Sequence, residues 1–143
     1  RFPKRAAAMA AAGPAANFVL VVLAAIGMRA GLATGYFELP AGGISLDTLV
    51  VAEAGVAEGL ALFASVLFSI NLILGCFNLI PLPPLDGYAM VPLVLSDRLR
   101  DKWFQLFSGR GSLLGLILAF VVFGRIMTPV FHGAIGLLYL GLG

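Results

Sequence analysis

Long uncharged stretches alternate along the chain with short clusters of charged residues. The first candidate span covers roughly 7–30 and carries no charge from 6 to 28, the second runs without a charge from 59 to 85, and the third begins after Arg110 and reaches Arg125. A helix of about 20 mostly apolar residues crosses the hydrocarbon core of a bilayer. The pattern therefore predicts about three transmembrane helices.

The chain stays apolar beyond Arg125, and Pro129 marks an expected bend because proline interrupts helical hydrogen bonding. Arg125 itself is expected near the far membrane interface, where a long side chain can extend its charge to water. The pattern thus predicts a C-terminal apolar segment that either lies along the outer surface or folds back.

Two further segments interrupt the apolar pattern. Residues 78–88 read NLIPLPPLDGY, and their three prolines predict a proline-broken segment at the end of the second span. Residues 96–108 combine charges with a face of Leu99, Trp103 and Leu106, which predicts a short interfacial helix that Ser96 caps. The predicted fold class is an all-α membrane protein.

Composition supports lipid as the solvent of this chain. Its 143 residues are 61% hydrophobic and 11% charged, whereas soluble domains are about half apolar and a quarter charged. The length suggests a single polytopic membrane domain over 1–143. Because the first residue is Arg1 rather than Met, we expect a fragment of a longer protein.

Charge and cysteine content exclude several classes of protein. The net charge of +2 comes without a basic cluster interleaved with aromatic residues, so we expect no nucleic-acid partner. The single cysteine, Cys76, excludes an internal disulfide framework and a cysteine-rich metal site.

The loops predict the orientation of the chain. Basic residues precede the first span and recur between the second and third, whereas the loop 31–58 is acidic. These charges are Arg1, Lys4 and Arg5, then Arg98, Arg100, Lys102 and Arg110, and in the acidic loop Glu38, Asp47, Glu53 and Glu58. Positive loops stay in the cytoplasm, so the N-terminus is predicted inside and 31–58 outside.

One carboxylate stands out, because Asp86 is the only formal charge between 59 and 95. A carboxylate near lipid normally faces protein, water or an ion. Non-helical backbone at membrane depth requires cover by protein or a wet cavity, and Gly87 permits a close backbone approach. Charge spacing leaves two possibilities open: a carboxylate that binds a cation or relays protons, or a surface turn in water.

A family resemblance favours the first possibility. The segment FNLIPLPPLDGY resembles the N-x-x-P-x-P-x-L-D-G signature of the site-2 protease family, the intramembrane zinc metalloproteases. The matching residues are Asn78, Pro81, Pro83, Leu85, Asp86 and Gly87. Upstream, AAAGPAANFVL resembles the family's G-P-x-x-N motif through Gly13, Pro14 and Asn17, and RFPKR matches the usual basic stretch before it. The resemblance covers about 7–110.

The resemblance implies a cofactor, a substrate and a role for each matching residue. Asp86 would be the third ligand of Zn²⁺, beside two histidines and a water. Asn78 would hydrogen-bond the substrate backbone or the oxyanion, or else cap the broken helix. Pro81 and Pro83 would hold the shape of the loop, with Gly87 beside them. Asn17 would contribute to substrate binding or act as a polar contact between helices.

The chain departs from the family pattern in one respect. The family's catalytic helix carries H-E-x-x-H, but this sequence has a single histidine, His132, and no such motif. Either an upstream part of the same chain supplies both zinc histidines, so that the fragment alone is inactive, or the protein is a degenerate homologue. His132 is predicted on the opposite side of the membrane from Asp86.

The sequence therefore predicts an intramembrane zinc metalloprotease core that cleaves transmembrane substrate helices. We expect a multi-pass protein of the bacterial inner (cell) membrane, with the lipid bilayer and a transmembrane protein substrate as partners. Two alternatives stay open: a catalytically inactive membrane scaffold of the same fold, and half of a transporter, which also uses proline-broken spans.

Overall fold

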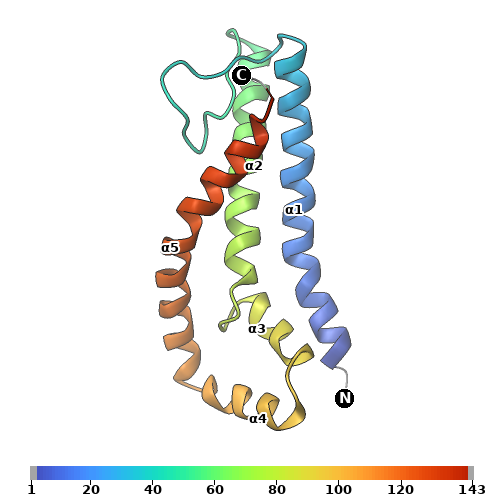
Figure 1. The fold of residues 1–143 in the computed structure, drawn as a ribbon, viewed down its shortest axis with the longest axis vertical. Helices are drawn as coiled ribbons and strands as arrows, with labels where there is room; N and C mark the ends of the chain where they lie inside the picture. Colours follow the sequence, from blue (N-terminus) through green and yellow to red (C-terminus); the bar gives the residue numbers. More distant parts are fainter. Residues whose placement is uncertain (1–2, 142–143) are drawn as a thin grey trace. The chain divides into compact units, whose positions relative to one another are not determined.

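The computed structural model describes residues 3–141, with side chains from Arg5 onwards, so the charges predicted at Arg1 and Lys4 lie outside the described side chains. Figure 1 shows the helices of the described residues in their order along the chain. The elements are α1 (Pro3–Ala33), α2 (Val56–Leu79), α3 (Asp86–Met90), the 3₁₀ turn η1 (Val91–Leu93), α4 (Asp97–Leu106) and α5 (Gly111–Leu138). The all-α prediction is confirmed.

Three of these helices, α1, α2 and α5, are long and apolar enough to cross a membrane. Large apolar side chains are exposed along them, among them Val19, Phe63 and Phe120 at 58%, 62% and 60%. Such exposure is what a helix surrounded by lipid tails presents, and the prediction of a multi-pass membrane protein is confirmed.

The C-terminal apolar segment is part of the third long helix, whereas the sequence predicted a separate segment after a bend at Pro129. Helix α5 runs without interruption past Arg125 and through Pro129 to Leu138. Proline removes a single backbone donor, and in lipid a helix is the arrangement that satisfies the remaining backbone groups within one segment. The last apolar residues therefore extend the third long helix.

The interfacial helix forms as α4, slightly shorter than the predicted 96–108. Ser96 occupies the cap position with an extended backbone, and its carbonyl accepts hydrogen bonds from the backbone of Leu99 (3.0 Å) and Arg100 (2.9 Å). Ser96 is thus the N-cap residue, as predicted, although its hydroxyl makes no capping hydrogen bond.

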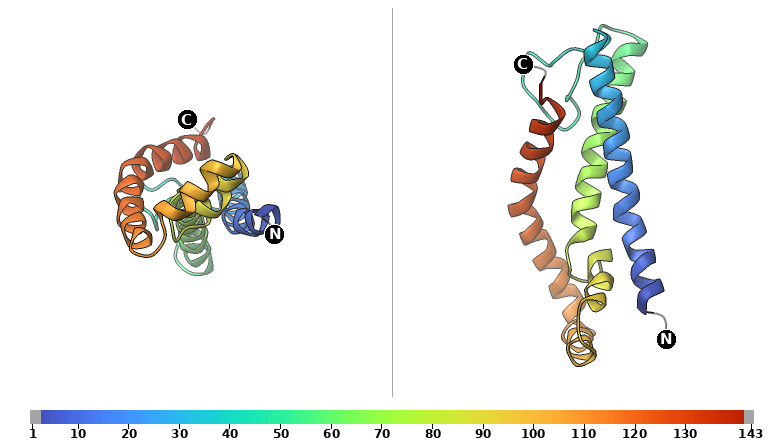
Figure 2. Two further views of the ribbon diagram at one scale, coloured as in Figure 1. Left: turned by 90° about the horizontal axis from the view of Figure 1, so that it is seen from below. Right: turned by 45° about the vertical axis from the view of Figure 1, so that its right-hand side comes forward.

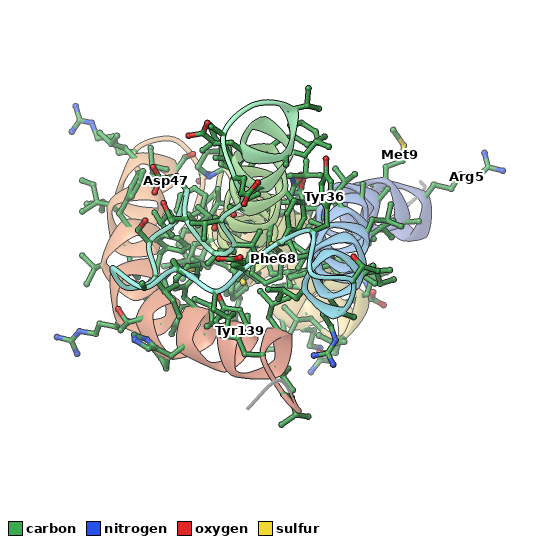
Figure 3. The ribbon with its side chains drawn as sticks, turned by 90° about the horizontal axis from the view of Figure 1, so that it is seen from above. Arg5, Met9, Tyr36, Asp47, Phe68 and Tyr139 are labelled. Carbon is green, nitrogen blue, oxygen red and sulfur yellow. The ribbon has the colours of Figure 1, made fainter. Side chains whose placement is uncertain are left out.

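Residue contacts divide the chain into two compact units, each built from parts of the long helices. The first comprises Arg1–Ala16 and Leu74–Val130, and the second comprises Asn17–Ile73 and Phe131–Gly143. In the first unit, α3 lies between the beginning of α1 and the beginning of α5 in both side views (Figures 1 and 2). On α1, Arg5 and Met9 point outward (Figure 3).

In the second unit, the connection between α1 and α2 is fastened to α2 by Ser65, which is fully buried. Its hydroxyl oxygen accepts hydrogen bonds from the backbone N–H groups of Leu49 (3.1 Å) and Val50 (3.3 Å), and it donates to the carbonyl of Ala61 (2.8 Å). Buried backbone donors need such partners, so this one side chain allows Leu49 and Val50 to be buried within a loop that is otherwise mostly exposed. Phe68, from the same helix, is also buried there (Figure 3).

The end of α5 in the second unit is held by two long-range hydrogen bonds. Arg29 donates from Nη1 to the carbonyls of Leu138 (2.7 Å) and Leu140 (3.0 Å), which satisfies acceptors left free at a helix C-terminus. The Tyr139 hydroxyl donates to the carbonyl of Leu49. Arg29, which bordered the acidic loop in the sequence, therefore acts as a helix cap.

We predict that Ser65→Ala lowers the free energy of unfolding by about 2 kcal/mol, because it leaves two buried N–H groups unpaired. The matched control is Ser69→Ala on the same helix. Ser69 is equally buried, but its hydroxyl has no hydrogen-bond partner among the described residues, so its loss should be nearly neutral. Thermal unfolding in detergent measures both variants, and equal losses would contradict the assigned role of Ser65.

Candidate active site

The proline-broken segment forms a tight connection between α2 and α3. Helix α2 ends at Leu79 and α3 begins at Asp86, so the break predicted within 78–88 occupies 80–85. Local hydrogen bonds close it, from Leu82 N to Ile80 O at 2.8 Å and from Leu85 N to Leu82 O at 3.0 Å. The Pro83–Pro84 peptide is cis. The segment therefore presents the first residue of α3, Asp86, from a compact turn.

Asp86 packs directly against α1 at Gly13. A Cβ atom on Gly13 would lie 2.8 Å from Asp86 Oδ2, closer than carbon and oxygen normally approach. The carboxylate is half-buried, so the missing side chain at Gly13 creates the space that the carboxylate uses. The glycine of G-P-x-x-N and the aspartate of L-D-G, far apart in sequence, thus meet in the first unit.

Gly87 fixes the other side of the same turn. A Cβ atom there would lie 2.5 Å from the carbonyl oxygen of Ile80 and closer still to that of Leu79. The constraint is space rather than conformation, because Gly87 does not adopt a positive φ. The predicted close backbone approach is therefore present, between the start of α3 and the end of α2.

A third glycine, Gly115 on α5, receives the proline loop. A Cβ atom on Gly115 would lie 2.8 Å from both Cγ and Cδ of Pro83 and 2.9 Å from its carbonyl oxygen. Pro83 is buried whereas Pro81 is exposed, so Pro83 is the proline that packs. Gly115 is not among the residues predicted from the sequence, although small residues where membrane helices approach closely are a known signal.

The two asparagines stand in different surroundings. Asn78 is half-buried in the last turn of α2 and belongs to the same unit as Asp86. Asn17 is half-buried on α1 and belongs to the second unit. The structure thus brings Asp86, Gly87 and Pro83 together with Gly13 and Gly115, and the roles of Asn78 and Asn17 stay predictions.

An aromatic cluster adjoins the turn. Tyr88, two residues after Asp86, contacts the rings of Trp103, Phe104 and Phe107, all on or next to α4. Burial raises the pKa of the Tyr88 phenol. The sequence pattern alone assigned no function to Tyr88. The regular spacing of aromatic residues on α4 was the available signal.

An open, shallow apolar groove of about 340 Å³ lies beside Gly87 in the first unit. Its walls come from the end of α2, the proline loop, α3 and η1, and they are almost entirely aliphatic. The lining residues are Leu79, Pro81, Gly87, Met90, Val91, Leu93 and Val94. A hydrocarbon side chain could be accommodated there, next to the turn that carries Asp86.

The described residues include no group of three or more His, Cys, Asp or Glu side chains placed to hold a metal ion. Catalytic zinc takes three protein ligands and a water. The half-buried Asp86 carboxylate fits one of these positions, since it is confined by packing and is an oxygen donor that zinc accepts. The other ligands would have to come from outside the described part of the chain.

The model of Peptidase family M50, the site-2 protease family, matches residues 2–122. The chain belongs to this family, and the resemblance seen in the two motifs is confirmed.

A relative of known description supports the same assignment. The chain is similar to "Putative zinc metalloprotease YwhC" of Bacillus subtilis (strain 168), with 38% identity over 77 residues. The match covers 54% of this chain and 32% of the relative, so the chain spans about a third of the length of the relative it matches. No solved structure matches the chain.

We predict that Gly115→Ala lowers the free energy of unfolding by about 1–3 kcal/mol, because the added methyl group collides with Pro83. The matched control is Gly124→Ala on the same helix, where a Cβ atom would meet nothing within 4 Å. That variant should gain up to about 1 kcal/mol from the better helix propensity of alanine. Unfolding curves in detergent measure both, and equal shifts would contradict the packing of Pro83 on α5.

Proposed function

We propose that this chain is the part of an intramembrane zinc metalloprotease that supplies Asp86 as a zinc ligand. The full protein would hydrolyse peptide bonds within transmembrane helices of its substrates. The observation that carries the proposal is the contact between Asp86 Oδ2 and α1 at Gly13, which joins the family's two motifs in one place. Membership of Peptidase family M50 supports a metalloprotease.

The position of Asp86 is suited to a metal ligand. It is the only formal charge between 59 and 95 of an otherwise apolar region, and a charge in such a setting is costly unless an opposite charge accompanies it. Packing at Gly13 and Gly87 restricts where its oxygens can lie. A carboxylate fixed in this way loses little further freedom when it binds a cation.

In this proposal the remaining ligands are two histidines outside the chain described here, in a segment of the same protein that precedes Arg1. The fragment by itself would then be inactive. Bound zinc would polarise the scissile carbonyl and lower the pKa of its water to about 7. Asp86 would be one of the three protein ligands, and its negative charge would partly neutralise the ion.

The other residues of the site would bind and orient the substrate. Asn78, at the end of α2, would donate a hydrogen bond to the substrate backbone or to the developing oxyanion, a contribution commonly worth about 3–4 kcal/mol in the barrier. Pro81 and Pro83 would keep the loop rigid. The open aliphatic groove beside Gly87 would accept an apolar side chain of a transmembrane substrate.

The proposal includes a location and an orientation. The protein would lie in the inner (cell) membrane of a bacterium, with the N-terminus of this chain on the cytoplasmic side. The basic residues on α4 and at Arg110, set against the acidic loop 31–58, support this orientation under the positive-inside rule.

In the full-length protein, Asp86→Asn is predicted to abolish chelator-sensitive cleavage of a transmembrane substrate, because an amide replaces an anionic ligand. Asp101→Asn, an exposed position on α4, is the matched control and should cleave at the wild-type rate. Cleavage is followed on gels in reconstituted membranes. Full cleavage by Asp86→Asn would refute the zinc assignment, and a zinc-loaded wild type that never cleaves would favour an inactive scaffold.

Gly13→Ala is predicted to weaken zinc binding and cleavage about tenfold or more while changing the free energy of unfolding little. The added methyl group would contact only the end of the Asp86 side chain, which can rotate away. The carboxylate is then displaced while the fold is retained. Gly27→Ala, also on α1 but with nothing within 4 Å, is the control and should keep wild-type zinc binding. Chelator competition measures zinc affinity, and equal affinities in both variants would contradict the proposed placement.

A further inference from the structure

We infer that Tyr88 is a positioning residue for Asp86, acting through its contacts with the aromatic face of α4. This face, hereafter the α4 aromatic cluster, consists of Trp103, Phe104 and Phe107. The inference rests on the proposed function, because it concerns the site in which Asp86 binds zinc. It assigns to α4 a role beyond that of a connector at the membrane surface.

Helix α3 needs external support because it has only five residues, Asp86–Met90. An isolated helix of one turn is unstable, since nucleation fixes several residues in return for very few hydrogen bonds. Its cap residue, Leu85, makes no side-chain hydrogen bond to the helix start. The orientation of Asp86 therefore depends on what packs against α3.

Gly87 supplies support on the side of α2, and Tyr88 supplies it on the side of α4. The Tyr88 ring stacks on Trp103 with centroids 5.7 Å apart and an interplanar angle of 26°. It meets Phe107 edge to face at 5.7 Å and 82°, and Phe104 at 5.9 Å and 85°. Both stacked and edge-to-face geometries are favourable for aromatic pairs.

The α4 aromatic cluster is itself ordered, because Trp103 and Phe107 contact each other with centroids 4.9 Å apart. The Tyr88 ring therefore packs against three aromatic rings of this cluster. Tyr88 and Asp86 lie in the same turn of α3, so a shift of the ring moves the carboxylate with it. Misplacement of a catalytic group by about 1 Å can cost about a hundredfold in rate.

The contacts involve the ring rather than the hydroxyl, which makes the inference specific. Tyr88→Phe should retain the stack, whereas Tyr88→Ala should lose it. Residues that orient metal ligands typically change metal affinity or activity by about 10–100-fold when they are removed. We expect effects of that size on zinc affinity and on kcat, with KM little changed.

The test uses the full-length protein reconstituted in lipid nanodiscs. Tyr88→Ala should weaken zinc affinity about tenfold or more by chelator competition and lower kcat about 10–100-fold, with KM within about twofold. Trp103 is the only tryptophan of this chain, and its emission should shift to longer wavelength in Tyr88→Ala; in the full-length protein, difference spectra against Trp103→Phe isolate this signal. Tyr88→Phe should match the wild type in all these measurements.

The matched control is Leu106→Ala on α4, because Leu106 is 68% exposed and should affect neither zinc affinity nor kcat. Should Tyr88→Ala fail to fold, Tyr88→Leu retains apolar bulk without a ring, and the same losses are expected. Wild-type zinc affinity and kcat in a folded ring-less variant would overturn the inference, as would a loss in Tyr88→Phe equal to that in Tyr88→Ala. Absence of zinc-dependent cleavage by the wild type would instead refute the proposed function.

Discussion

The structure depends on how a single carboxylate is accommodated within an apolar region. A charged Asp86 is costly to expose to lipid, so the surrounding chain must hold it against protein. It does so by ending α2 at Leu79 and turning through the proline loop, which brings Asp86 against α1 at Gly13. Every feature of the candidate site follows from keeping that turn in place.

Three glycines, which have no side chain, allow most of the close contacts around this turn. Gly13 leaves room for the carboxylate, Gly87 lets α3 rest on the end of α2, and Gly115 admits Pro83 to the surface of α5. Between membrane helices there is little hydrophobic driving force, so close van der Waals approach is a main source of association. The site is therefore rigid on the sides that glycine lines, and Tyr88 with the α4 aromatic cluster supports the remaining side.

The second unit meets a different requirement, which is to bury Leu49 and Val50 in an irregular and otherwise mostly exposed loop. Its backbone groups must find partners, because an unpaired buried N–H is costly. Ser65 accepts from Leu49 and Val50, and Arg29 donates to carbonyls at the end of α5. Ser65, together with the Tyr139 hydroxyl that donates to the Leu49 carbonyl, holds the loop without a regular sheet, since the described residues of the loop form only isolated β-bridges such as Glu38 with Val51.

The sequence by itself determined the membrane class, the three long helices, the break before Asp86 and the family, because apolar run length, proline and a spaced motif are local properties. It did not reveal that α5 continues past Arg125, because a charge and Pro129 resemble an end signal when packing is unknown. Only the tertiary structure decided that Gly13 faces Asp86 and that Gly115 faces Pro83. Those contacts join residues far apart in the chain, and they depend on which faces of the helices meet.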